Sequence, residues 1–379
     1  NYLLRTHSND SFYGEKMKRY IFREKQIVDE YRYIFLCGTK YGRNSMKDKR
    51  NVIRNFIKTS NSCYKPIILE DNFIFKKNRS RFLVYDDIYM KDLYQVEMLT
   101  NYLSDKNIII HESISTGAET GLFLSEEQMA KKTCLLVPDQ IAVEEDKIGQ
   151  FIKLAFLSEA SDVKIITYYP RVEKNIISNE VMNWHTYFHK DTIGENLGKN
   201  IIEFLKCDAL KYQIRFTKNI NKVNEGMIHY SVIDGRLEIT ALPRIIMLCI
   251  ATIFNVDEFE DGIFNAGYKQ MKEYIAIVKK HLQQVFINTI VEETGKEIYS
   301  CSITPRMNVG GVYISGVIGM CLYLFQAAEF IQIEKDKDYK ESGKVEITRK
   351  IVQCKTGMNH FFYKKYDECI GCAVDTQIV

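Results

Sequence analysis

Short apolar runs alternate with amphipathic stretches between residues 32 and 206. The runs have the length and continuous apolar character of buried strands, and they are residues 32–36 (RYIFL), 65–69 (KPIIL), 107–110 (NIII), 133–137 (TCLLV) and 163–169 (VKIITYY). The intervening stretches have helical spacing, and they cover residues 45–58, 85–104, 116–131, 142–157 and 193–206. Strands separated by helices predict a parallel sheet that is covered on both faces. We therefore expect an α/β domain with a Rossmann- or flavodoxin-like sheet over residues 32–206.

The pattern differs on either side of this region. Residues 1–31 are mixed in charge and weakly helical from Glu15 to Glu30, which suggests an N-terminal extension that docks elsewhere. Residues 207–379 predict a mainly helical second domain, because an uncharged run at 245–256 is followed by helical spacing at 268–290.

The end of this second domain has the order helix, strand, charged turn, strand. Residues 330–333 form the first predicted strand, 334–344 the charged loop and 345–348 the second strand. This order is typical of a winged helix. A helical oligomerisation domain with a surface hairpin is the alternative.

Residues 309–328 contain no charged side chain and are long enough to cross a membrane. The run includes four glycines together with Ser315 and Gln326, and it ends at Glu329. An aromatic and basic belt, which usually flanks a membrane span, is missing. We expect a buried element here and no membrane association.

Composition is consistent with a globular protein of two domains. The chain has 379 residues, of which 46% are hydrophobic, and its net charge is only 52 − 49 = +3. These values exclude a disordered chain and a general polycation, so any contact with nucleic acid must come from local patches. The ten cysteines form no dense framework and no signal peptide opens the chain, which predicts a cytoplasmic protein. Because the first residue is Asn1, we expect some N-terminal residues to be missing.

The densest group of candidate chemistry follows the third predicted strand. Glu112 and Glu119 lie seven residues apart, across a turn of small residues that opens a helix. Ser115 or Thr116 can cap that helix, and Glu119 would then lie in or near its first turn, where the helix dipole favours the ionised form. A carboxylate beside a second carboxyl group suits attack on the anomeric carbon of a sugar. Alternatively, both glutamates simply face water at a helix start and a strand end.

The stretch 112–123 (ESISTGAETGLF) resembles the Glu-Ser-Pro-Gly-Ser-x-x-Glu-Leu-Gly-x-Phe motif of the nucleoside deoxyribosyltransferase-like effectors of retrons. The resemblance extends over about residues 32–170, and it includes 33–38 (YIFLCG), the helix with Arg50 and Arg54, 68–73 (ILEDNF), 94–99 (YQVEML) and 135–140. Two departures stand out. Ile114 and Ser115 replace the usual Pro-Gly, and Thr120 replaces a common Leu.

The resemblance implies a role for several positions. Glu119 matches the nucleophile, Glu97 the acidic residue that helps to hold the base or sugar, and Glu112 the acidic residue at the strand end. Asp71 matches the acidic residue after the second strand, and Gly38 matches a glycine at the end of the first strand. We also expect substrate-binding roles for Ser113, Ser115 and Thr116 in the turn and for the basic residue Arg43. Gly38 would let the ligand approach the first strand. In the related transferases, the glutamate attacks C1′ of a nucleoside, and a base or water resolves the intermediate.

For the retron effectors, this chemistry implies toxic depletion of a nucleotide, with NAD⁺ as the favoured substrate and no separate cofactor. The implied partners are a retron reverse transcriptase and its branched RNA–DNA product (msDNA), which would hold the effector inactive in a higher-order oligomer.

Basic residues are concentrated in two places that favour a phosphate-bearing ligand. Residues 40–58 carry seven basic side chains and one acidic side chain, and a second basic loop contains Lys76, Lys77, Arg79 and Arg81. The first group suits a dinucleotide or a nucleic-acid backbone, and the second suits nucleic acid. Both groups could instead be solvated surface.

The C-terminal cysteines give a weaker indication of a metal site. Cys369 and Cys372 form a CxxC, and Cys354 and His360 precede it. The spacing is unusual for zinc, so we expect buried thiols and no metal.

Three functions fit these observations. The resemblance favours a retron effector that cleaves the N-glycosidic bond of a nucleotide. A salvage nucleoside 2-deoxyribosyltransferase would share the motif but would have little use for the second domain. A winged-helix DNA-binding regulator would use the N-terminal domain only to sense a nucleotide.

Overall fold

The computed structural model describes most of both predicted domains. The described residues are 19–26, 31–39, 48–71, 85–138, 154, 163–168, 188–189, 192–207, 212–218, 226–335, 339–341, 344–346, 348–354 and 366–373.

A five-stranded parallel sheet organises the first part of the chain. Its strands are β3 (Arg32–Cys37), β4 (Tyr64–Ile67), β5 (Lys106–Ile110), β6 (Thr133–Pro138) and β7 (Lys164–Tyr168). They lie in the order β4-β3-β5-β6-β7, and every neighbouring pair is parallel. The predicted α/β class is therefore confirmed. The strand order reverses between β3 and β5, and ligands of open α/β sheets bind at the carboxyl ends of the strands at such a point.

Helices cover both faces of this sheet, as the continuous apolar strands require. Helices α1 (Lys49–Ser60) and α7 (Glu195–Lys206) share one hydrophobic cluster with Ile34 and Leu36 of β3. Helices α2 (Leu93–Leu103) and α3 (Ile114–Leu124) belong to a second cluster that takes the alternate positions of β3, Tyr33 and Phe35.

Two predicted helices are interrupted. The 3₁₀ turn η3 (Tyr85–Ile88) precedes α2, because Asp92 accepts a hydrogen bond from the Gln95 N–H and caps a new helix there. The short helix α4 (Glu127–Lys131) follows α3. The predicted helix at 142–157 lies outside the described residues except for Leu154.

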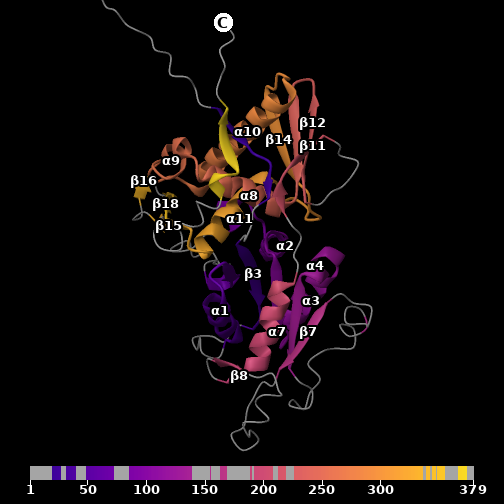
Figure 1. The fold of residues 1–379 in the computed structure, drawn as a ribbon. Helices are drawn as coiled ribbons and strands as arrows, with labels where there is room; N and C mark the ends of the chain where they lie inside the picture. The colour runs from indigo at the N-terminus through magenta and orange to yellow at the C-terminus, as the bar shows by residue number, and fades with distance from the viewer. Residues whose placement is uncertain are drawn as a thin grey trace, which may run out of the picture.

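The second part of the chain contains a sheet as well as helices (Figure 1). Its four strands are β11 (Phe216–Thr217), β12 (Ile228–Ile233), β13 (Arg236–Ala241) and β14 (Ser300–Pro305). Its helices are α8 (Pro243–Ile253), α9 (Asp257–Ile263), α10 (Met271–Thr294) and α11 (Ile314–Ala327).

The sequence reading missed the antiparallel hairpin of β12 and β13. Its two-residue turn is Asp234-Gly235, and both residues have positive φ angles of 49° and 70°. Asp-Gly is the expected sequence for such a turn, because both central residues must adopt left-handed conformations. The sequence therefore contains a local signal for this hairpin within a region whose overall pattern predicts helices.

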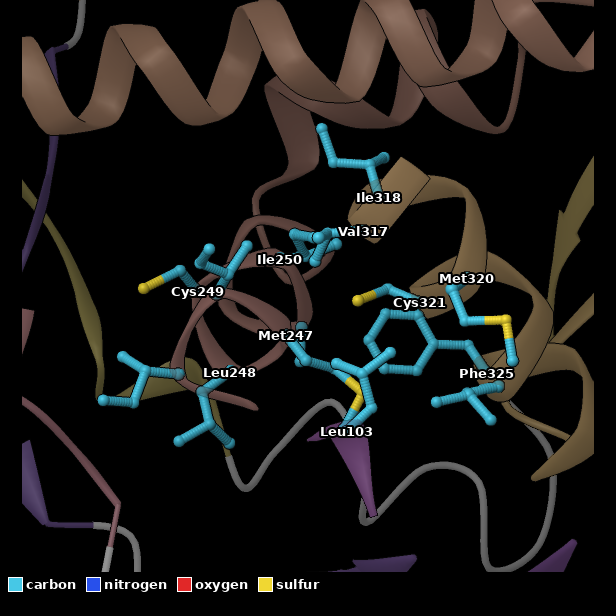
Figure 2. Packing of buried hydrophobic residues seen from close by; sticks show 14 of the residues in the cluster. Leu103, Met247, Leu248, Cys249, Ile250, Val317, Ile318, Met320, Cys321 and Phe325 are labelled. Carbon is cyan, nitrogen blue, oxygen red and sulfur yellow. The ribbon is translucent and has the colours of Figure 1, made fainter. Parts of the chain in front are cut away.

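The uncharged run at 309–328 forms mostly helix α11, which is buried. Val317, Cys321 and Phe325 of α11 lie beside Met247 and Ile250 of α8 in Figure 2, and these side chains belong to one cluster. Among the described residues, no helix is both long and apolar enough to cross a bilayer.

The hairpin after α11 differs in register from its prediction. Strand β15 (Ile331–Lys335) pairs antiparallel with β18 (Arg349–Gln353), and not with residues 345–348. The intervening charged segment contains a second small hairpin of β16 (Tyr339–Glu341) and β17 (Lys344–Glu346). Polar alternation in this segment resembled a loop, although it is compatible with solvent-exposed strands.

The N-terminal extension contains strands, and the helical expectation is wrong for its described residues. Strand β1 (Arg19–Phe22) pairs antiparallel with β19 (Ile370–Ala373), and β2 (Lys25–Gln26) pairs with β10 (Gln213–Ile214). The Phe22 N–H also donates to Thr289 Oγ1 of α10 at 2.9 Å. Figure 1 shows the indigo β1 beside the yellow β19 in the C-terminal half, so the extension docks there as expected. A short hairpin of β8 (Phe188–His189) and β9 (Thr192–Ile193) completes the described elements.

The two parts of the chain share one core. Helices α8 and α11 pack against α2, and Leu103 of α2 lies beside Met247 of α8 (Figure 2). A buried ion pair adds to this contact, because Arg244 Nε of α8 lies 3.1 Å from Asp105 Oδ1. Helix α2, which carries Glu97, is thus packed against the C-terminal helices.

Candidate active site

The start of helix α3 determines where Glu119 lies. Ser113 is the N-cap, and it and Thr116 form a reciprocal capping box, in which the Ser113 N–H donates to Thr116 Oγ1 at 2.9 Å. The sequence reading placed the cap at Ser115 or Thr116. Because the helix begins at Ile114, Glu119 falls in its second turn, where the helix dipole acts weakly.

The departures from the resembled motif fit this geometry. Ile114 is the first helical residue and its side chain is 95% exposed, and Ser115 is exposed as well. The first helical position is where proline is favoured, since its fixed backbone angle suits the helix and its missing N–H is not needed. Ile114 therefore replaces proline without a clash.

Three glutamates from separate elements act on one another at the carboxyl edge of the sheet. Glu119 comes from α3, Glu97 from α2, and Glu70 from η2 (Leu69–Asp71) after β4. Burial, followed by the charges of Glu97 and Glu70, raises the pKa of Glu119 to about 8. Burial and the charge of Glu70 raise the pKa of Glu97 to about 7. We call Glu119, Glu97 and Glu70 the acidic cluster.

The protonation of Glu119 is thus opposite to the sequence expectation, which had the helix dipole favouring its ionised form. Desolvation and neighbouring carboxylates outweigh the dipole, because both penalise the charged form in a site with little water. Strongly perturbed carboxylates in such positions are typical of catalytic sites.

Two buried polar atoms at this edge have no hydrogen-bond partner among the described residues. They are Glu119 Oε2 and Thr39 Oγ1, the latter two residues after the end of β3. Buried polar atoms are nearly always paired in native structures. Glu119 Oε2 and Thr39 Oγ1 are therefore candidates for contact with a ligand.

Arg50 is a buried cation that contacts the acidic cluster through Glu70. Its side chain is 2% exposed, and its guanidinium donates to Glu70 Oε1 at 2.8 Å and to Asp48 Oδ2 at 2.8 Å. Its charge lowers the pKa of Glu119, which partly offsets the two carboxylates.

Gly38 makes room for this arginine. A Cβ atom at Gly38 would lie 3.0 Å from Arg50 Cγ and 3.4 Å from Ile110 Cβ. The resemblance assigned Gly38 to the approach of a ligand, whereas the group that packs against it is the Arg50 side chain. The absence of a side chain at Gly38 therefore allows Arg50 to reach Glu70.

Glu112 belongs to a different group of side chains. Its Oε1 lies 2.5 Å from Lys49 Nζ and accepts a hydrogen bond from the hydroxyl of Tyr168, at the end of β7. Lys49 Nζ also lies 5.5 Å from the centre of the Tyr168 ring. The sequence reading paired Glu112 with Glu119. In the structure, Glu112 is neutralised by Lys49 and ties the turn before α3 to α1 and β7.

The basic residues of α1 are also engaged with carboxylates. Arg54 pairs with Asp71, a predicted substrate-binding residue, and Lys58 Nζ lies 3.1 Å from Glu329 Oε1. With Lys49 and Arg50, these account for the described members of the predicted phosphate-binding group. Arg43, Lys76, Lys77, Arg79 and Arg81 lie outside the described residues.

The C-terminal cysteines are divided between interior and surface. Cys369 is buried, Cys372 is exposed at β19, and His360 lies outside the described residues. Within the described part of the chain, no group of three or more His, Cys, Asp and Glu side chains is placed to hold a metal ion.

Sequence reasoning missed Glu70 and the role of Arg50. Glu70 stands beside Asp71 in the segment ILEDNF, which the resemblance had included, but the second acidic residue was selected. The signal for Glu70 is its place directly after the second strand, which it shares with Asp71.

The raised pKa of Glu119 predicts a pH-dependent stability. Its carboxyl ionises near 4.5 in the unfolded chain and near 8 in the folded protein, so unfolding releases a proton between these values and stability falls as pH rises. Glu119→Gln removes this penalty. We expect the melting temperature of Glu119→Gln to exceed that of the wild type by a margin that grows from pH 5 to pH 8, measured by circular dichroism. A margin independent of pH would contradict the raised pKa.

The candidate site lies within a region of the chain that matches a known protein family. A family model described as STM3845 retron effector protein matches residues 46–295, about two thirds of the chain. The match includes the acidic cluster and Arg50, and it runs across the join between the two parts to the end of α10. No curated protein matches the chain.

Proposed function

The chain belongs to the STM3845 retron effector protein family, and from this premise we propose that it is an N-glycosidase that depletes a nucleotide, with NAD⁺ as the favoured substrate. Its role as a retron defence effector follows from the family. The glycosidase activity is our proposal, and the observation that carries it is the buried carboxylate of Glu119 at the point where the strand order reverses.

The acidic cluster has the parts that a two-step displacement needs. Glu119 Oε2, which has no hydrogen-bond partner among the described residues, attacks C1′ of the ribose. An oxygen–carbon bond forms as the bond from C1′ to the base nitrogen breaks, and the electron pair leaves with the base. Nicotinamide leaves as a neutral molecule from the cationic ring, so this step needs no proton donor. The glycosyl ester on Glu119 then awaits water.

Glu97 is suited to the second step. Its pKa of about 7 means that it is partly ionised at neutral pH, as a general base should be. It takes a proton from the water that attacks C1′, and Glu119 leaves as a carboxylate. Because burial raises the pKa of both carboxyl groups, a cationic base would favour their ionisation on binding.

Glu112 has a positioning role in this proposal. Its bonds to Lys49 and Tyr168 would fix the turn that precedes α3, and hence the direction of the helix that Ser113 caps. Thr39 Oγ1 would hydrogen-bond to a hydroxyl of the ribose, since it lies at the same strand edge and has no partner among the described residues.

The same proposal includes the partners and the regulation. A retron reverse transcriptase and its msDNA would bind the effector and hold it inactive in the cytoplasm within a higher-order oligomer, until infection releases the activity. Helix α11 followed by the β15–β18 hairpin supports a winged-helix element for contact with nucleic acid. The N-terminal domain would have the fold of the nucleoside deoxyribosyltransferases.

Incubation of the purified chain with NAD⁺ tests the activity. We expect release of nicotinamide and ADP-ribose, which chromatography detects. We expect no exchange of the base when free adenine is added to a deoxynucleoside. Base exchange without NAD⁺ cleavage would instead identify a salvage transferase. Neither reaction, together with sequence-specific binding to duplex DNA, would identify a regulator and overturn the proposal.

A further inference from the structure

Three exposed tyrosines lie on adjoining segments near the N-terminal end of α2. Tyr89, Tyr94 and Tyr313 have exposed fractions of 44%, 46% and 75%. Two exposed lysines, Lys91 and Lys272, accompany them. We call these five residues the tyrosine patch.

Contacts between three segments hold the patch together. Lys272 Nζ, at the start of α10, lies 5.2 Å from the centre of the Tyr89 ring. The Lys91 N–H donates to Gln95 Oε1, and Gln95 Nε2 donates to the carbonyl oxygen of Gly310 at 2.9 Å. The segment before α11, which carries Tyr313, is thereby fastened to the start of α2.

Tyr89 is held in an unusual conformation. Its φ angle of 58° lies in the left-handed region, which is costly for a bulky residue other than glycine. The Met90 N–H donates to the carbonyl oxygen of Tyr85 at 2.9 Å and closes this turn. Such strain persists mainly at functional positions, and here it keeps an aromatic ring at the surface instead of in the core.

The patch carries two cationic side chains, Lys91 and Lys272, and its neighbouring carboxylates have hydrogen-bond or ion-pair partners within the fold. Asp92 caps α2, Glu273 accepts from the Gln270 N–H at 2.8 Å, and Asp87 lies 3.5 Å from Arg349 Nη2. The ammonium group of Lys272 lies beside the Tyr89 ring, and Lys91 is exposed two residues after Tyr89 in the chain.

We propose that the tyrosine patch binds single-stranded nucleic acid. Exposed aromatic rings interspersed with lysines match a strand whose bases stack on the rings while its phosphates meet the ammonium groups. Duplex nucleic acid hides its base faces and would use only the lysines. The inference deepens the proposed partnership with retron nucleic acid and rests on it for the source of the strand.

The position of the patch relates binding to the acidic cluster. Tyr94 and Glu97 are one turn apart on α2, and the charge of Glu97 acts on the hydroxyl of Tyr85, which precedes the patch. A strand bound to the patch therefore lies beside the proposed catalytic residues, where it could restrict access to them.

Fluorescence anisotropy of a labelled 20-nucleotide oligothymidine with the full chain tests this. We expect the double variant Tyr94→Ala/Tyr313→Ala to bind at least about tenfold more weakly than the wild type, because each lost stacking contact weakens binding severalfold or more. The double variant with Phe at both positions should bind nearly as well as the wild type. Tyr299→Ala is the matched control, since Tyr299 is 76% exposed but lies beside Gly235 in the distant hairpin.

Two outcomes would overturn the inference. One is wild-type affinity in the alanine double variant. The other is equal binding of a 20-base-pair duplex that is unaffected by the tyrosine changes, which would indicate contact with phosphates alone. Loss of binding to the reverse transcriptase without its nucleic acid, with oligothymidine binding unchanged, would also overturn it and assign the patch to a protein partner. Because no turnover is measured, a failed glycosidase proposal would leave this result interpretable.

Discussion

Replacement of Glu119 by Gln should reduce NAD⁺ cleavage by roughly three orders of magnitude or more while the protein remains folded. An amide of nearly the same shape cannot act as the carboxylate nucleophile, and removal of a nucleophile is among the most damaging changes an enzyme can suffer. Burial raises the pKa of Glu119 to about 8, so activity of the wild type should rise with pH from 6 to 8 as the carboxylate ionises. Nicotinamide release at each pH measures both effects.

Glu112→Gln provides the comparison. Glu112 is bonded to Lys49 and Tyr168 and acts through the position of α3, so its loss should reduce turnover much less than the loss of Glu119. The pH at which activity is half-maximal should stay unchanged in this variant, because Glu119 and Glu97 remain in place. Full activity of Glu119→Gln, or an equal loss in both variants with a shifted pH profile, would contradict these roles.

The second large effect concerns the join between the two parts of the chain. Arg244 is 1% exposed, and its guanidinium bonds to Asp105 and to the carbonyl oxygen of Tyr31 at 3.0 Å. Arg244→Met keeps an apolar stem of similar length but removes the hydrogen-bonded ion-pair partner of the buried Asp105 carboxylate. We expect the free energy of unfolding to fall by about 3–5 kcal/mol, measured by urea denaturation.

Two further variants separate this cause from a general loss of packing. Arg236 is an exposed arginine on β13, and Arg236→Ala should change stability by less than about 0.5 kcal/mol. Adding Asp105→Asn to Arg244→Met should recover part of the loss, because the amide oxygen can still accept from the Tyr33 N–H without carrying a buried charge. A double variant less stable than Arg244→Met would show that the unpaired carboxylate is not the cause.

Much of the first part of the chain could be predicted from the sequence. The strands at 32–36, 107–110 and 133–137 agree with β3, β5 and β6 to within a residue, because runs of apolar β-branched residues are a local signal of buried parallel strands. The hairpin of β12 and β13 also had a local signal, in Asp234-Gly235, that was passed over. The register of β15 with β18 had none, because strand pairing depends on which remote strand presents the complementary edge.

The candidate site also has features that the sequence predicts and features that it does not. The capping residues Ser113 and Thr116 lie within six residues of Glu119 in the chain. The sequence by itself therefore determined that a capped helix after a strand would carry this glutamate. Only the tertiary structure decided its neighbours. Glu70 comes from the loop after another strand and joins the acidic cluster, whereas Glu112, which is close in sequence, turns to Lys49. The protonation of a buried carboxyl depends on desolvation and on charges brought together from distant segments, and a linear pattern carries neither quantity.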